Sequence, residues 1–185
     1  MHVVLWIVLS LGAAFAATYV FVRRAQRVQP PLIMPAGERM PTTSLQRLAW
    51  RVFVPTLVLT LAAAAVVVYH GVAVAWDNDT VRLTATFLLL AALAVFTYYI
   101  ARVRMWQMRD DGTLDERDRA ILASAPAGQA PAMTVAMAIW MIALSEKYQA
   151  THLVPSAYLY LIFWTLLMIS ILAGLAGVII GYRRS

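Results

Sequence analysis

Five long apolar stretches, separated by polar and charged residues, dominate the pattern of hydrophobic and polar positions along the chain. They cover residues 3–22, 52–76, 83–101, 128–145 and 153–182. A helix needs about 20 apolar residues to cross the hydrocarbon core of a bilayer, and most of the stretches are near that length. The pattern predicts an all-α protein, a single transmembrane domain that forms an integral membrane bundle of five transmembrane helices.

The basic residues lie mainly on one side of these predicted spans. Of the 15 lysines and arginines, all except Arg82 and Lys147 fall in segments 23–51 and 102–119 or in the C-terminal tail. Because cytoplasmic loops of membrane proteins carry the excess of basic residues, we expect the N-terminus outside and the C-terminus in the cytoplasm. Opposite sides for the two termini require an odd number of spans, which favours a true span at 128–145, the weakest stretch.

Composition supports a membrane protein and indicates which class of partner it has. The chain is 62% hydrophobic and only 13% charged, whereas soluble domains carry about 25% charged residues. With the basic residues next to the spans, the net charge of +6 favours anionic lipid headgroups at the cytoplasmic face, not nucleic acid, as the partner. The absence of cysteine excludes disulfides, thiolate metal sites and cysteine nucleophiles.

Two cytoplasmic segments connect the spans. Residues 23–51 form a proline-containing linker, and residues 113–124 are expected to form a short amphipathic helix at the level of the inner headgroups. Thr113 and Glu116 have the spacing of a capping box at the start of this helix. It could dock a cytoplasmic partner, or be a solvated helix whose charges neutralise one another.

The run Asp115-Glu116-Arg117-Asp118-Arg119-Ala120-Ile121, followed by a span, resembles a motif of small bacterial multi-span membrane proteins of unknown function. The resemblance covers about 30 residues around this motif. It implies a bacterial inner-membrane protein and carries no activity with it.

Three histidines, His2, His70 and His152, map to the outer side, where Glu146 is also expected. Imidazole and carboxylate groups suit zinc or copper, and two histidines from different helices can ligate a haem. Histidine is also at home at headgroup depth as an amphipathic residue. His70 and His152 are therefore the candidates for a shared cofactor, with interfacial placement as the alternative.

Two further patterns concern the helix surfaces. Met133, Met137 and Met141 recur every four residues; this stripe could bind copper(I), but methionine more often fills gaps in helix packing. Small residues four apart let helix backbones approach closely. Such pairs are Ala132 with Ala136 and Gly177 with Gly181, and they could pack within the bundle or against another subunit.

The predicted spans contain no Asp, Glu, Lys or Arg, although ion and proton pathways usually need such groups. We therefore expect no catalysis and no ion-coupled transport, but a non-catalytic accessory, assembly or scaffolding subunit of a bacterial inner-membrane complex. A membrane protein partner would contact spans four and five. The alternative is a haem- or metal-binding redox or metal-handling protein that uses the outer-side histidines.

Overall fold

The computed structural model describes residues 2–27, 43–108, 114–151 and 153–182, with side chains described from residue 12 to 24 in the first segment. Every element in these ranges is helical. The elements are α1 (His2–Arg27), α2 (Ser44–His70), α3 (Val72–Asp77), α4 (Asp79–Met108), α5 (Glu116–Ser124), the 3₁₀ helix η1 (Ala125–Gly128), α6 (Gln129–Lys147) and α7 (Ser156–Tyr182).

Four helical segments in the described ranges are long and apolar enough to cross a membrane. These are α2, α4, the continuous segment from α5 through α6, and α7. The described helices confirm the all-α class, and the four apolar segments are consistent with a multi-pass membrane protein.

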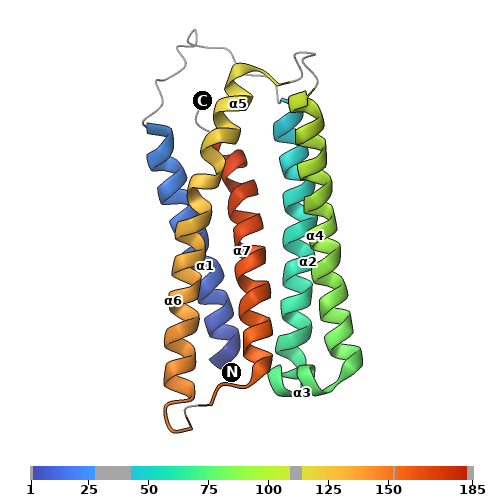
Figure 1. Ribbon diagram of the computed structural model, residues 1–185, viewed down its shortest axis with the longest axis vertical. Coiled ribbons are helices and arrows are strands. Elements are labelled where there is room, and N and C mark those ends of the chain that lie inside the picture. The colour runs from blue at the N-terminus through green and yellow to red at the C-terminus, as the bar shows by residue number, and fades with distance from the viewer. Residues whose placement is uncertain (1, 28–42, 109–113, 152, 183–185) are drawn as a thin grey trace.

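Helix α7 lies between two groups of helices (Figure 1). Helices α2 and α4 pack together on one side of it, and α1 and α6 pack together on the other. In the most apolar part of α7, 56% of the residues are buried, against 22–28% in the other three candidate spans. The bundle is therefore built around α7, whereas the other three candidate spans each leave a broad apolar face uncovered.

The start of α2 and the end of α4 lie at the same end of the bundle as α5 and the end of α7 (Figure 1). We call this the basic end, because all the described arginine side chains except Arg82 belong to helix segments that finish or begin there. The opposite end holds α3 and the connection between α6 and α7.

At the basic end, α2 begins well before the expected apolar stretch at residue 52. The Thr43 hydroxyl accepts a hydrogen bond from the Gln46 backbone N–H at 3.2 Å and so caps the first turn. Leu45 and Ala49 are fully buried in this extra part of the helix. The apolar stretch marked the part of the helix suited to lipid, and the helix itself extends into the segment expected as a linker.

At the opposite end, the expected uninterrupted span 52–76 is divided at Gly71. This glycine has a φ of +81°, a conformation that side chains disfavour, and it ends α2 at His70. The short helix α3 follows, and the Asn78 side chain then accepts hydrogen bonds from the backbone of the first turn of α4. The short helix α3, flanked by Gly71 and Asn78, thus connects α2 to α4.

Helix α5 differs from a helix that lies free on the surface. Its N-cap is Asp115, whose carboxylate accepts a hydrogen bond from the Asp118 N–H at 2.7 Å, while the expected cap Thr113 lies outside the described residues. Asp118 and Ile121 are buried. Through η1, α5 continues into α6 as one segment packed along α7.

Candidate functional site

The residues expected to share a cofactor are only partly described. His70 is exposed at the last residue of α2 and packs edge-on against Tyr69, with ring centroids 5.0 Å apart. Glu146 is exposed near the end of α6, and α7 lies between α2 and α6 (Figure 1). His152 and the side chain of His2 lie outside the described residues. In the parts of the chain that are described, no three His, Asp or Glu side chains are grouped for a metal ion, and a shared site stays a prediction.

The methionine stripe faces outward. Met137 and Met141 are 51% and 60% exposed, and Ile142 beside them is 53% exposed. Met133 is half-buried. Met137 and Met141 therefore fill no gap inside this bundle; they form an apolar surface on α6. Trp140, on another face of α6, is buried against Leu144 and Tyr158.

The small residues lie where helices approach closely. Ala132 and Ala136 are fully buried and cluster with Ala14 of α1 and Ala173 of α7. A Cβ atom at Gly177 would stand 2.4 Å from the backbone oxygen of Ala125. Gly181 is also buried in the end of α7. These positions sit against other helices of the same chain.

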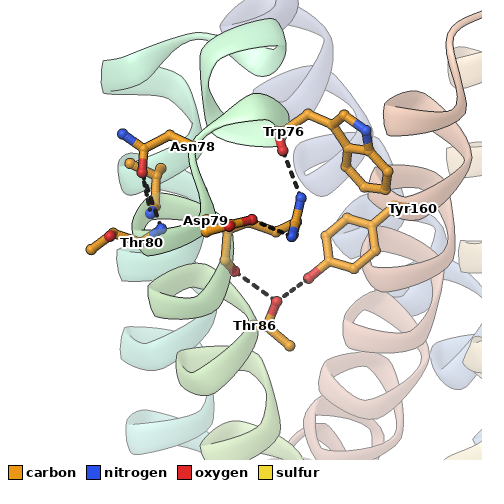
Figure 2. A network of polar contacts seen from close by, with 8 residues as sticks. Trp76, Asn78, Asp79, Thr80, Thr86 and Tyr160 are labelled. Atoms are coloured by element: carbon orange, nitrogen blue, oxygen red, sulfur yellow. Dashed lines mark hydrogen bonds and ion pairs between the residues drawn. The ribbon is translucent and has the colours of Figure 1, made fainter.

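A network of polar contacts joins three elements at the opposite end of the bundle (Figure 2). The Arg82 guanidinium donates to the Trp76 carbonyl at 2.8 Å, pairs with Asp79 at 2.5 Å and lies 5.6 Å over the Trp76 ring. The Thr86 hydroxyl donates to the Arg82 carbonyl at 2.7 Å and lies 2.5 Å from the Tyr160 hydroxyl of α7. This network fixes α3 and the start of α4 against α7.

The second cation of that end is held in a similar way. The Lys147 ammonium at the end of α6 donates a hydrogen bond to the Tyr158 hydroxyl of α7. It also lies 4.9 Å from the centre of the Tyr158 ring and 5.5 Å from that of Tyr148. The pKa of the Tyr148 phenol is raised above its usual value, mainly by burial and secondly by hydrogen bonding to Tyr158. Both aromatic rings therefore serve to hold the lysine at the connection between α6 and α7.

At the basic end, a buried carboxylate joins α5 to α7. Asp118 is only 2% exposed, and it accepts a hydrogen bond from the Tyr182 hydroxyl at the last residue of α7. The Arg117 guanidinium lies 5.2 Å from the centre of the Tyr182 ring. A buried carboxylate is costly unless it is hydrogen-bonded, so this contact fastens α5 to the end of α7.

A groove of about 240 Å³ opens between α2 and α4 at the same basic end. Its walls include Arg47, Leu48 and Arg51 of α2 and Tyr98, Arg102 and Trp106 of α4. All three arginines are exposed. The Arg102 guanidinium lies 5.9 Å from the centre of the Trp106 ring. The groove thus combines three positive charges with two aromatic side chains.

A second, smaller groove of about 60 Å³ lies between α2, α4 and α7 and is lined mainly by apolar side chains. Leu89, Trp164 and Met168 form part of its wall. The Thr60 hydroxyl, which also reaches this wall, already donates to the Thr56 carbonyl at 2.7 Å. This groove offers apolar contact surface and presents no group arranged for bond-breaking chemistry.

Two of these arrangements were not anticipated. The contact between Asp118 and Tyr182 joins residues 64 positions apart, so no local sequence pattern predicts it. The spacing of four between Arg47 and Arg51 places them on one helix face, but both residues fall in the segment that the sequence predicts to be a linker. The approach of Arg102 to that face follows from the pairing of α2 with α4, which the spacing does not reveal.

Comparison with known proteins adds no further evidence, since no family model, curated protein or solved structure matches this chain. The resemblance of the segment 115–121 to small bacterial membrane proteins stays a prediction.

Proposed function

We propose that the protein is a non-catalytic accessory, assembly or scaffolding subunit of a bacterial inner-membrane complex. The observation that carries this proposal is the contrast between α7 and the helices around it. Helix α7 is largely buried from Met168 to Tyr182 and holds two helix pairs, while the polar contacts already described hold helices together. The uncovered apolar faces are then the functional surfaces, and they contact lipid or another membrane protein.

In this proposal α1 is the fifth span, so that the N-terminus is outside and the C-terminus is in the cytoplasm. Helix α1 has 26 residues and runs beside α6 and α7 (Figure 1). Its buried Ala14, Thr18 and Val22 face the bundle. It starts at the end opposite to the one where α7 finishes. With the arginines gathered at the basic end, the positive-inside rule puts that end in the cytoplasm.

The partner in this proposal is an apolar transmembrane helix of another subunit, bound to the outward face of α6. Met137, Met141 and Ile142 provide an adaptable apolar surface, because methionine side chains adjust to irregular partners. Near the opposite end, the exposed Leu159 and Phe163 of α7 add to the surface available for contact. The sequence predicted that a partner would contact spans four and five. In this proposal the contact excludes the part of α7 that carries Gly177 and Gly181, because that part is inside the bundle.

Site-specific photo-crosslinking in native membranes tests the partner surface. A photoreactive amino acid at Met141 is expected to give one discrete crosslinked protein. The matched control is the same amino acid at Val58 of α2, which is similarly exposed, at 57%, on the other side of the bundle. No crosslinked protein from Met137 or Met141, or equal crosslinking from Val58, would contradict the proposed surface.

The haem- or metal-binding alternative has a separate measurement. Protein purified from native membranes is expected to show no Soret band and no stoichiometric copper or zinc. A Soret band, or one bound metal ion per chain that is lost in a His70→Ala variant, would replace the scaffolding proposal with the redox or metal-handling one.

A further inference from the structure

The basic groove between α2 and α4 carries an unusual concentration of charge. Arg47 and Arg51 project from successive turns of α2, and Arg102 of α4 lies across the groove from them. No carboxylate in the described parts of the chain forms an ion pair with any of the three. Three guanidinium groups around one hollow repel one another, and an anion in the hollow would relieve that repulsion.

The guanidinium groups favour a particular class of anion. Arginine presents a planar fork of N–H donors that matches the geometry of carboxylate and phosphate oxygens. Trp106, half-buried against Arg102, keeps that guanidinium beside the groove through its ring face. Tyr98 adds a phenol to the wall. A phosphate group is the anion that can use several of these donors at once.

The surface that continues from the groove identifies the rest of the ligand. On α2, the exposed positions 47 and 51 are followed along the same face by Val54, Val58 and Leu61, which are 48–57% exposed. This stripe leads from the groove into the apolar part of α2, which is a candidate membrane span. A molecule with a phosphate head and long hydrocarbon chains would use the charged and the apolar parts together, whereas free phosphate would use only the first.

We propose that the groove between α2 and α4 is a binding site for the phosphate headgroup of an anionic glycerophospholipid, with an acyl chain along the exposed face of α2. Arg47, Arg51 and Arg102 contact the phosphodiester, and the side chains of Tyr98 and Trp106 border the headgroup. Basic pockets between transmembrane helices on the cytoplasmic side are well suited to such lipids. The site rests on local geometry and does not depend on the proposed scaffolding role.

Native mass spectrometry of the detergent-solubilised full chain, titrated with phosphatidylglycerol, tests this site. The wild-type protein is expected to retain one lipid more tightly than any other. An Arg47→Gln, Arg51→Gln, Arg102→Gln triple variant is expected to bind it about a hundredfold more weakly, since each basic residue next to an anionic lipid contributes about fivefold. The single variants Arg51→Gln and Arg102→Gln keep two of the three charges and are each expected to weaken binding about fivefold.

The matched control is an Arg23→Gln, Arg24→Gln, Arg104→Gln triple variant. It removes the same charge from exposed arginines of the basic end that do not line the groove, and its affinity for phosphatidylglycerol is expected to equal that of the wild type. Equal loss in both triple variants would overturn the proposal in favour of general charge attraction. Equal retention of zwitterionic phosphatidylcholine, or displacement of phosphatidylglycerol by an equal concentration of inorganic phosphate, would also overturn it.

Discussion

The two ends of the bundle hold their positive charges in different ways. At the opposite end, Arg82 contacts Trp76 and Asp79, and Lys147 contacts two tyrosines. At the basic end, Arg47 and Arg51 border a groove in which no described carboxylate reaches them. The cations of the opposite end therefore serve to hold the chain's own helices, whereas these two are available to a ligand from outside the chain.

The two ends also differ in how deeply their polar contacts are buried. The basic end buries the carboxylate of Asp118 against Tyr182, while the ion pair of the opposite end is partly exposed, with Asp79 at 77%. A buried charge depends strongly on its partner, and an exposed pair contributes little. The basic end should accordingly be more sensitive to the loss of an internal contact.

The largest effect is expected from Gly177→Ala, which adds a Cβ atom 2.4 Å from the Ala125 backbone oxygen. The clash should separate α7 from η1 and lower the free energy of unfolding by about 3 kcal/mol, the upper end of the usual cost of overpacking. Chemical denaturation in detergent measures it. Gly12→Ala is the control, because nothing lies within 4 Å of a Cβ there and alanine favours the helix. Equal stability of both variants would disprove the close contact.

Tyr182→Phe should have the next largest effect, because it leaves the buried Asp118 without the tyrosine hydroxyl. We expect a loss of about 2 kcal/mol in the free energy of unfolding. Tyr160→Phe at the opposite end should cost less, about 1 kcal/mol or below, since the Thr86 hydroxyl keeps its bond to the Arg82 carbonyl. If the two losses were equal, the basic end would not be the more sensitive one.

A smaller effect is expected from Arg82→Gln, which removes a partly exposed ion pair. The free energy of unfolding should fall by about 0.5–1 kcal/mol. Raising the salt concentration should reduce the difference between wild type and variant, because salt screens exposed pairs. A difference that did not change with salt would assign the role of Arg82 to its contacts with Trp76 instead.

The smallest effect, and one of opposite sign, is expected from Tyr99→Phe. The Tyr99 hydroxyl is buried in α4 without a hydrogen-bond partner in the described structure. Removing it should leave the stability unchanged or raise it by up to about 1 kcal/mol. A loss as large as that of Tyr182→Phe would reveal a partner for this hydroxyl.

The hydrophobic pattern predicted the helical class and the four segments that the structure shows to be long and apolar enough to span, because bilayer thickness imposes a minimum length on any apolar helix. It did not predict where α2 begins and ends. Thr43 starts α2 and Gly71 ends it, and both positions depend on caps and backbone conformation that lie outside the apolar stretch. The sequence also did not predict that the methionine stripe faces outward, because the buried face of α6 depends on which helices pack against it.

From the sequence alone came the all-helical membrane class and the gathering of arginines beside one set of helix ends, because hydropathy and charge act on each segment locally. Tertiary structure decided the central place of α7, the burial of Asp118 by Tyr182 and the groove between Arg47, Arg51 and Arg102. Each of these depends on contacts between residues far apart in the chain. The packing of helix against helix sets such contacts, and in a bilayer close surface fit between helices determines that packing.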